Sequence, residues 1–408
     1  MTKKEIKQLL KDFDFIRTGG SAEELRAAEA LRDRCEALGA RAWLEPFPVD
    51  MAEVHAASLT VNGAAYRCEG FRGCGSGSVE AELCYLPNTD KAALAAAKGK
   101  IALLETGVTH FLYQDLIEAG IVGFVTYTGD VHYPDADVDR RELRSYVSLG
   151  KKRLGVNINA KDAFRIVRAG GGTARIAVEQ TEWTGESRDV VAELPGETDE
   201  WLVLTAHYDS TPLSRGSYDN FSGCVGLLSL IERFRGQTLR RGLRFVFCGS
   251  EERGLLGSKA YTAAHADELD KVVLNINLDM IGSVMGKFIA CVSGEEALVS
   301  YLRYLGAELG WGIAPRMGVY SSDSTPFADH GVPALSFARI APPSQATIHN
   351  RYDTPALLSP EQLQADSAFV AEFTRRMAQA AVCPVKREIP EKVRKELDEY
   401  LCRKRKDA

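Results

Sequence analysis

Histidine and carboxylate side chains follow several apolar runs of this 408-residue sequence, and these side chains are typical ligands of divalent metal ions. His207 and Asp209 come directly after the run Trp201–Ala206, and a spacing of two in an extended segment places both side chains on one face. The Asp209 carboxylate can then hold the second ring nitrogen of His207, which is the usual support of a metal-bound histidine. The pair therefore predicts a metal ligand with its hydrogen-bonding partner, and a structural histidine is the alternative.

Glu251 and Glu252 follow a second apolar run, Leu243–Cys248, after a Gly-Ser turn. Adjacent carboxylates at the end of a buried strand repel each other, so that one pKa rises unless a cation lies nearby. The pattern favours a metal site in which one carboxylate is a ligand and the other is a base. Two solvated surface charges are the alternative.

Three further residues complete the candidate set of ligands. Asp219 precedes the helical stretch Gly223–Phe234, where it either binds metal or caps the helix. Asp279 ends the apolar stretch LNINLD, and an aspartate at the tip of so apolar a strand needs a partner if it is buried. His349 lies in a later loop and has no local apolar context. It is a candidate ligand only in combination with the other four residues.

The charges of these residues favour a pair of ions. Asp219, Glu252 and Asp279 together carry −3, while the imidazoles of His207 and His349 are neutral. Two divalent ions add +4 and a bridging hydroxide adds −1, so that the sum is zero, whereas one divalent ion leaves the site negative. Histidine and carboxylate ligands suit zinc, and manganese, cobalt and iron remain open.

The elements that would position these residues alternate between buried strands and helices. The expected strands are Trp201–Ala206, Leu243–Cys248, Val272–Ile276 and Val332–Phe337, and the expected helices are Gly223–Phe234 and Ser258–His265. This alternation predicts an α/β fold with a mostly parallel, doubly wound sheet. Ligands of such sheets bind outside the carboxyl ends of the strands, which is where the candidate residues lie.

The first 48 residues have the pattern of two helices and a strand. Ser21 and Glu24 have the spacing of a capping box, which predicts the start of the second helix. Residues 41–50 predict a strand that ends at its prolines.

The length of the chain favours two domains. Because residues 49–185 change to short β-like runs and Gly-rich turns, we expect them to form a smaller, β-rich insert. Residues 1–48 and 186–385 would then form one discontinuous domain. Residues 386–408 predict a charged helix with a thin apolar stripe, which favours docking on the chain itself or on a second copy in a homo-oligomer.

Composition limits the location and the partners of the protein. The formal net charge is −6, whereas a nucleic-acid-binding protein carries a basic excess, so we expect no nucleic-acid partner. No apolar run approaches the ~18–20 residues that cross a bilayer, and the charged N-terminus lacks the apolar region of a secretion signal. Nine cysteines without paired spacing fit free thiols in a reducing compartment. We therefore expect a cytoplasmic protein without a membrane partner.

Six segments, in order and in spacing, resemble the motifs of the co-catalytic dizinc aminopeptidase family. They read HYDS, SYDNFSGCVGLL, SEERGLLGS, NLDMIG, SSDSTPF…HGVPALSF and IHNRYDT. Glutamate carboxypeptidase II, the glutaminyl cyclases and the transferrin receptor ectodomain belong to the same wider metallopeptidase group. Residues 49–185 resemble the protease-associated insert of this family. One segment departs from the family pattern, because Ser322-Asp323-Ser324 stands where the family often has Ser-Asp-His.

The resemblance implies a set of metal ligands. His207 and Asp279 would bind one zinc ion, and Glu252 and His349 would bind the other. Asp219 would bridge the two ions, and the presence of all five residues weakens the alternative of a non-catalytic, receptor-like protein.

The resemblance also implies an activity, the removal of N-terminal residues from peptides by a hydroxide that bridges two zinc ions. Glu251 would be the general base, which takes a proton from water and passes it to the departing amine. Asp209 would support His207, and Tyr320 is a candidate hydrogen-bond donor to the substrate in the transition state.

Three other functions remain open at the level of the sequence. A carboxypeptidase or dipeptidase needs cations for the substrate carboxylate, and Arg215, Arg339 and Arg351 lie in or near the site loops. A glutaminyl cyclase-like acyltransferase would use the same scaffold. A binding protein with structural metals is the non-enzymatic alternative.

We expect His110 and His132 of the insert to be surface histidines.

Overall fold

The computed structural model describes residues 1–132, 138–342 and 345–406. Residues 407–408, the end of the expected C-terminal helix 386–408, lie outside the described residues. That helix is shorter than expected, because α12 spans Glu391–Tyr400, directly after Pro390. Proline lacks the N–H group that a residue in a helix interior donates, but it is tolerated at a helix start. Pro390 therefore explains why the helix begins at Glu391.

The chain divides into two compact units. Unit 1 comprises Met1–Val49 and Glu186–Ala408, and unit 2 comprises Asp50–Gly185. Two long strands, β1 (Arg41–Val61) and β8 (Gly172–Leu194), contribute residues to both units. The protease-associated character of the insert stays a prediction.

Unit 1 is built from strands and helices that alternate along most of its length. They are α1 (Lys3–Asp12), α2 (Ala22–Ala37), β9 (Trp201–His207), α7 (Ser222–Phe234), β10 (Gly242–Cys248), α8 (Leu256–Ala264), β11 (Val272–Leu278), β12 (Lys287–Ser293), α9 (Glu296–Leu309), β13 (Ala314–Met317), α10 (Ser324–Asp329), β14 (Ala334–Ile340), α11 (Pro360–Gln379) and α12. Short helical turns lie at Ser217–Phe221, Glu251–Arg253, Leu269–Lys271 and Pro355–Leu357.

The sheet of unit 1 has the strand order β13-β12-β14-β11-β9-β10-β8. The four central strands, β14, β11, β9 and β10, run parallel to one another, so their carboxyl ends meet at one edge. The register pairs His207 with Cys248, which places the segments that follow β9 and β10 next to each other. The prediction of an α/β fold with a mostly parallel sheet is confirmed. The expected strand list omitted β12, which joins β14 as an antiparallel neighbour.

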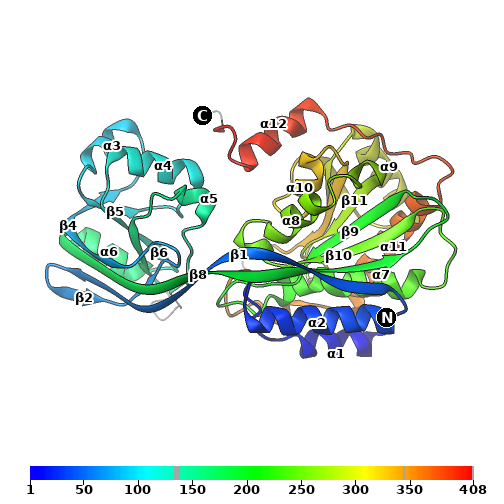
Figure 1. Ribbon diagram of the computed structural model, residues 1–408, viewed down its shortest axis with the longest axis horizontal. Coiled ribbons are helices and arrows are strands. Elements are labelled where there is room, and N and C mark those ends of the chain that lie inside the picture. Colours follow the sequence, from blue (N-terminus) through cyan, green and yellow to red (C-terminus); the bar gives the residue numbers. More distant parts are fainter. Residues whose placement is uncertain (133–137, 343–344, 407–408) are drawn as a thin grey trace. The chain divides into compact units, whose positions relative to one another are not determined.

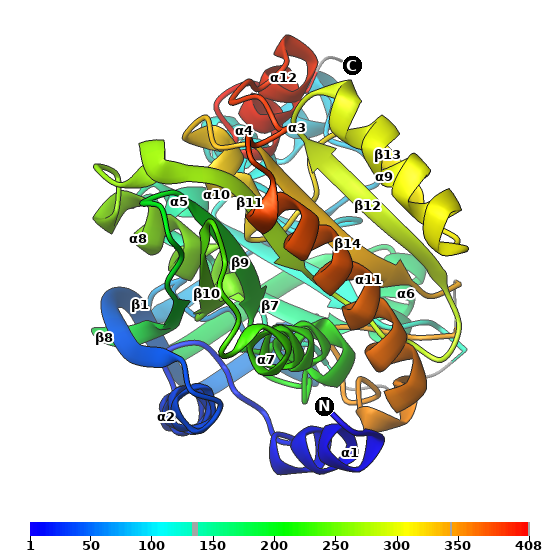
Figure 2. The ribbon, with the colours of Figure 1, turned by 90° about the vertical axis from the view of Figure 1, so that its right-hand side faces the viewer.

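Helices cover both faces of this sheet (Figures 1 and 2). On β9, Leu202, Leu204 and Ala206 pack in a core with α7 and α11, while Val203 faces a second core that includes Phe327 of α10. Each fully buried aliphatic side chain of this kind stabilises the fold by about 1.5–3 kcal/mol. The two cores fix the central strands, and thereby fix the loops at their carboxyl ends.

The strands of unit 2 pair with one another and surround a separate hydrophobic core. The other elements of unit 2 are β2 (Ala64–Tyr66), β3 (Cys68–Gly70), β4 (Gly77–Leu86), α3 (Lys91–Ala96), β5 (Ile101–Leu104), α4 (His110–Ala119), β6 (Gly123–Thr128), α5 (Ser145–Ser148), β7 (Leu154–Asn159) and α6 (Ala160–Arg168). The strands β4, β5, β6 and β7 are parallel, β8 and β3 flank them as antiparallel neighbours, and their core contains Phe124 and Ile176.

The expected end of the first strand at residue 50 is wrong, because β1 continues to Val61. Pro46 and Pro48 lie inside this strand. Their positions differ by two, so both missing N–H groups lie on the same side of the strand, and the opposite side can still pair.

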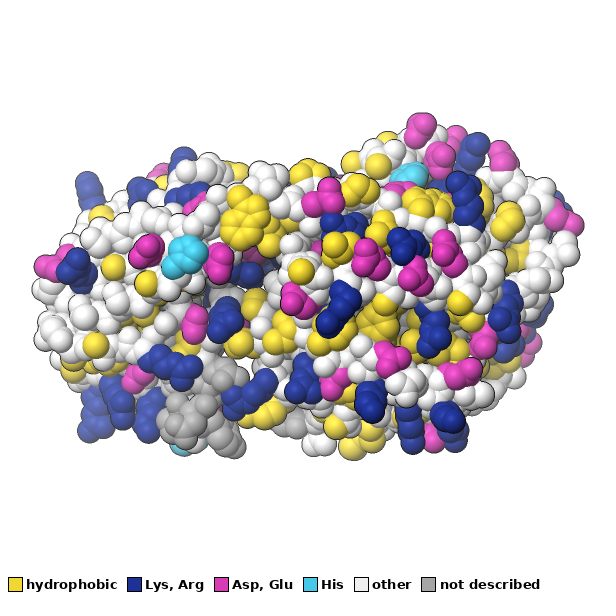
Figure 3. All heavy atoms as spheres, turned by 60° about the horizontal axis from the view of Figure 1, so that its bottom comes forward, with side chains coloured by type: hydrophobic (Ala, Val, Ile, Leu, Met, Phe, Trp, Pro, Cys, Tyr) yellow, Lys and Arg dark blue, Asp and Glu magenta, His cyan; other side chains and the backbone are white. Residues whose placement is uncertain are grey.

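The surface carries charges of both signs. Lys and Arg side chains are interspersed with Asp and Glu side chains on the face shown in Figure 3. Among the described residues, no helix combines the length and the apolar character that a membrane span requires.

Candidate metal centre

The carboxyl edge of the central strands brings the five candidate ligands together. His207 ends β9, Asp279 follows β11, Glu252 lies in the turn after β10, Asp219 lies in the turn before α7, and His349 lies in the loop after β14. They form two overlapping groups, in each of which the candidate ligand atoms lie within 4.8 Å of one another. Their role as metal ligands stays a prediction at this point.

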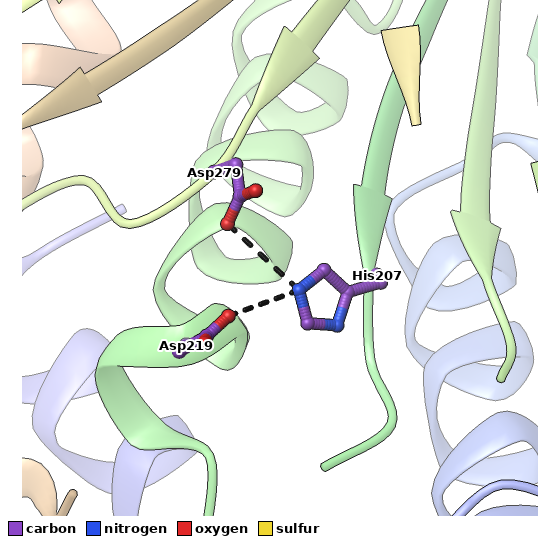
Figure 4. Close-up of side chains that lie close together, drawn as sticks. All are labelled: His207, Asp219 and Asp279. Atoms are coloured by element: carbon purple, nitrogen blue, oxygen red, sulfur yellow. Dashed lines mark hydrogen bonds and ion pairs between the residues drawn. The ribbon is translucent and has the colours of Figure 1, made fainter. Parts of the chain in front are cut away.

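The first group contains His207, Asp219 and Asp279 (Figure 4). The Nε2 atom of His207 lies 3.1 Å from Oδ1 of Asp219 and 3.8 Å from Oδ1 of Asp279. All three side chains point toward one another from different elements, as Figure 4 shows.

The second group contains Asp219, Glu252 and His349. The Nε2 atom of His349 lies 3.0 Å from Oδ2 of Asp219 and 3.1 Å from Oε2 of Glu252. Asp219 therefore directs one carboxylate oxygen to each group, so it is the member that the two groups share.

The two groups differ in their access to solvent. The side chain of His207 is 1% exposed and that of Asp279 is 6% exposed, whereas that of His349 is 50% exposed. The open side of the centre is therefore the side of His349.

Asp209 contacts the segments that follow both strands, and its role as a supporting carboxylate stays a prediction. Its Oδ1 lies 3.4 Å from Nδ1 of His207, and its two oxygens accept the backbone N–H groups of Glu251 and Glu252 at 2.9 and 3.2 Å. The Glu251 carboxylate lies 3.9 Å from Nε2 of His207. One buried side chain thus orients His207 and the Glu251-Glu252 turn together.

Asp353 plays a similar part that the sequence analysis did not assign. It is fully buried, and its two oxygens accept the N–H groups of Tyr218 and Asp219 at 2.7 and 3.1 Å. Asp353 therefore fixes the backbone of the shared ligand Asp219. Its spacing of four from His349 in IHNRYDT was the available signal.

Glu24 is a second buried carboxylate whose role the sequence analysis missed. Ser21 caps α2 as expected, because its Oγ accepts the Glu24 N–H at 3.1 Å. The Glu24 carboxylate does not complete a capping box. It accepts the N–H groups of Gly20 and Ser250 at 2.6 and 3.0 Å and the Ser187 hydroxyl at 2.7 Å. Helix α2 thereby holds Ser250, the residue before Glu251.

Arg17 anchors the same N-terminal segment to the loop after β9. It is fully buried, and its guanidinium donates hydrogen bonds to backbone carbonyls that include those of Tyr208, Arg215 and Gly216. Burial lowers the pKa of Arg17 to about 10. The loop that leads from His207 to Asp219 is therefore tied to the N-terminal segment.

Three residues near the ligands have a left-handed backbone although none is glycine. Ser250 has φ 51°, Met280 has φ 61° and His349 has φ 61°. Such a conformation costs about 1–2 kcal/mol per residue. Hydrogen bonds hold two of the three, because Ser250 donates its N–H to Glu24 and Met280 donates its N–H to Asn220 Oδ1 at 3.0 Å. Strain of this kind gathers at functional sites.

The pKa values of the candidate ligands reflect crowded negative charge in a buried place. Burial raises the pKa of Asp279 to about 7, and burial together with nearby carboxylates raises the pKa of Glu251 and of Glu252. Burial alone would lower the pKa of His349, but hydrogen bonds with Asp219 and Glu252 raise it to about 11. Burial would raise the pKa of Asp219, but hydrogen bonds with both histidines keep it below its ordinary value.

The donor set fits a pair of divalent ions. Oδ1 of Asp279 is buried and has no hydrogen-bond partner among the described residues. Asp219 and Asp279 form ion pairs with histidines and with no described lysine or arginine. Buried carboxylates whose only basic partners are histidines are readily stabilised by a cation, and nitrogen and oxygen donors are ligands that zinc accepts.

The segment that departs from the family pattern is buried beside the centre. Asp323 is fully buried, its Oδ1 accepts the Ser258 hydroxyl at 2.6 Å, and burial raises its pKa to about 6. Ser324, where the family often has histidine, shares a hydrogen bond of 2.8 Å with Ser336. His110 and His132 lie in unit 2 and belong to neither group of candidate ligands.

Comparisons with known proteins find aminopeptidases among the proteins that are similar to this chain. Residues 189–374 match the family described as Peptidase family M28. Over 172 residues the chain is 31% identical to Aminopeptidase YwaD of Bacillus subtilis (strain 168), and this alignment covers 40% of the chain and 38% of the relative. The chain thus spans well under half the length of this curated relative.

Two solved structures resemble nearly the whole chain. The aminopeptidase from Aneurinibacillus sp. strain AM-1 is 25% identical, with a TM-score of 0.77 and coverage of 94% of this chain and 96% of that chain. BSAP, a zinc aminopeptidase from Bacillus subtilis, is 22% identical, with a TM-score of 0.77 and coverage of 96% and 97%. The likeness to BSAP supports the fold.

The Glu24 contacts predict that Glu24→Gln destabilises the protein. Each Glu24 oxygen accepts a backbone N–H, so an amide NH₂ in either position would face a donor. We expect the free energy of unfolding in urea to fall by about 1–3 kcal/mol. The matched control is Glu29→Gln, at an exposed position of the same helix. Equal stability of the two variants would contradict the role of Glu24.

The pKa of His349 predicts that metal binding releases protons. A histidine with a pKa of about 11 holds its proton at neutral pH, and a metal ion must displace this proton. Zinc affinity should therefore rise with pH throughout the range below about pH 11, in which the free His349 holds its proton. Calorimetric titrations in buffers of different ionisation enthalpy measure the release, and His349→Ala should release fewer protons. Zinc binding without proton release would contradict this prediction.

Proposed function

We propose that the chain is a metal-dependent aminopeptidase, which removes N-terminal residues from peptides, because residues 189–374 match the family described as Peptidase family M28. One observation carries the proposal. Asp219 directs its two carboxylate oxygens to two groups of ligands, as a shared ligand of two ions would. The aminopeptidase names of the relatives support the same function.

The proposed cofactor is a pair of zinc ions. His207 and Asp279 would hold one ion, Glu252 and His349 would hold the other, and Asp219 would bridge them. The nitrogen and oxygen donors support this assignment, as does the buried Oδ1 of Asp279, which has no hydrogen-bond partner among the described residues. BSAP is described as a zinc aminopeptidase, which favours zinc over the other candidates.

The chain itself supplies proton transfer and orientation. Bound metal ions would act as Lewis acids that activate water and polarise the substrate carbonyl. The Glu251 carboxylate would accept a proton from the attacking water and deliver it to the nitrogen of the departing amine. Asp209 accepts hydrogen bonds from the backbone N–H groups of Glu251 and Glu252, so it fixes the positions of the proposed base and the neighbouring ligand.

Tyr320 is the proposed hydrogen-bond donor to the substrate. Its hydroxyl is buried and has no hydrogen-bond partner among the described residues. Burial raises the pKa of Tyr320, and the negative charges of Asp279 and Asp219 raise it further. A protonated hydroxyl near these aspartates can donate to the oxygen of the scissile carbonyl.

Two of the three cations that a carboxypeptidase could use, Arg339 and Arg215, pair with carboxylates of the chain. The Arg339 guanidinium donates to both oxygens of Asp366 at 2.6–3.2 Å and to the carbonyl of Gly286. Arg215 pairs with Asp14 at 2.8 Å. These contacts support the aminopeptidase over the carboxypeptidase, since a free N-terminal amine would instead meet the acidic centre. Arg351, which lies beside Tyr352, stays a candidate for the alternative.

Two further expectations concern the setting of the enzyme. Self-association through the C-terminal helix stays a prediction, and Val393 and Leu397 of this helix are buried against the chain itself. A cytoplasmic location also stays a prediction.

The proposed base predicts the effect of Glu251→Gln. The amide cannot accept a proton, so kcat should fall about 10²–10⁴-fold while the metal content is unchanged. Elemental analysis and steady-state kinetics on the same sample measure both quantities. Glu252→Gln is the contrasting variant, because it should lower the metal content. Near-normal turnover of Glu251→Gln with full metal content would rule out Glu251 as the base.

A panel of chromogenic substrates tests the proposed function. We expect hydrolysis of aminoacyl p-nitroanilides with a free amine, no hydrolysis of their N-acetylated forms, loss of activity with a chelator and recovery with zinc. Activity only on N-blocked peptides with a free carboxylate would favour the carboxypeptidase. Cyclisation of N-terminal glutamine without peptide cleavage would favour the acyltransferase.

A further inference from the structure

The C-terminal helix α12 lies beyond the part of the chain that matches the peptidase family, which ends at residue 374. It packs on the rest of unit 1 through Val393 and Leu397, and Ile389, two residues before the helix, joins them. These three side chains are at most 4% exposed and share a core with Phe327 of α10. This apolar stripe accounts for the attachment of the helix. The polar side chains of the helix contact a different part of unit 1, the loop that contains Tyr320.

Two side chains of α12 hold the loop on either side of Tyr320. Oε2 of Glu396 accepts the backbone N–H of Val319 at 3.0 Å. The hydroxyl of Tyr400 lies 2.7 Å from Oγ of Ser321, within hydrogen-bond distance. The residue before Tyr320 and the residue after it are thus both bound to the same helix.

Gly318 permits this close approach. A Cβ atom at this position would lie 3.0 Å from Oε2 of Glu396, and the backbone has φ 151°, which L side chains rarely adopt. The N–H of Gly318 also donates to the carbonyl of Val292 in β12. The loop therefore leaves the sheet and meets α12 directly.

Tyr320 itself is fixed through its backbone and available through its hydroxyl. Its carbonyl accepts the Ser322 N–H and the Thr325 hydroxyl, both at 2.8 Å. Its hydroxyl has no hydrogen-bond partner among the described residues. These hydrogen bonds thus hold the backbone of Tyr320, and its hydroxyl can still donate a hydrogen bond.

We propose that α12 is a positioning element of the active site, in which Glu396 and Tyr400 hold the loop Gly318–Ser321 so that the Tyr320 hydroxyl meets the substrate. The inference rests on the proposed function, because it gives α12 a role in the same reaction. Glu396 binds a backbone N–H, so the contact fixes the path of the loop. Glu396 and Tyr400 are positioning residues, since they act through Tyr320 and not on the substrate.

The first test removes the polar contacts of Glu396 and Tyr400 and leaves the apolar stripe of the helix unchanged. Glu396→Ala and Tyr400→Phe should each lower kcat, by about tenfold for Glu396→Ala, with little change in metal content. Glu396→Gln keeps an acceptor oxygen and should restore kcat to within about twofold of the wild type. The control is Glu399→Ala, on the same helix, which should behave as the wild type.

A double-mutant cycle with Tyr320→Phe separates positioning from general stability. If Glu396 acts through the Tyr320 hydroxyl, Glu396→Ala should have no further effect on kcat in the Tyr320→Phe background. If α12 only stabilises the fold, Glu396→Ala should lower the Tm and should reduce kcat equally in both backgrounds. The second result would overturn the inference.

Amide hydrogen exchange gives a readout that does not depend on turnover. Glu396→Ala should speed exchange in residues 318–321, where the Val319 N–H loses its acceptor, and Glu399→Ala should not. Unchanged exchange would overturn the inference.

The outcomes also separate the inference from the proposed function. If the wild type and Glu396→Ala cleave aminoacyl p-nitroanilides equally well, or if Tyr320→Phe has normal kcat, the inference fails and the aminopeptidase stands. If the wild type with zinc cleaves no substrate of the panel, the proposed function fails and the inference fails with it.

Discussion

The arrangement of the centre depends on one buried carboxylate with two directions of contact. Asp219 faces His207 with one oxygen and His349 with the other, at 3.1 and 3.0 Å. Asp279 and Glu252 add negative charge on the two sides, and no described lysine or arginine pairs with Asp219 or Asp279. Such a concentration of buried charge is costly unless cations neutralise it. The loops around it must therefore be held against their mutual repulsion.

Buried carboxylates that bind backbone N–H groups supply this support. Asp353 holds the backbone at Asp219, Asp209 holds the turn at Glu251 and Glu252, and Glu24 holds Ser250. Hydrogen bonds between a charged acceptor and an N–H group are shorter and stronger than neutral ones. Helix α2, which supplies Glu24, lies outside residues 189–374, the part of the chain that matches the family.

The sequence predicted the features that follow from local pattern and order. Apolar runs that end in His207 and Asp279 predicted both the parallel strands and the edge where these side chains meet. Patterns of that kind do not record which backbone group a distant side chain will bind. Ser21 and Glu24 have the spacing of a capping box, which predicts a contact within the helix start. The Glu24 carboxylate instead binds the N–H of Ser250, which is distant in the sequence. Likewise β1 continues through its prolines, because pairing with another strand outweighs a local signal to stop.

Diffraction from zinc-soaked crystals, collected on both sides of the zinc absorption edge, tests the central claim most directly. The account predicts two anomalous peaks, one on each side of the Asp219 carboxylate, next to His207 and next to His349. A single peak, or two peaks that do not share Asp219, would contradict it.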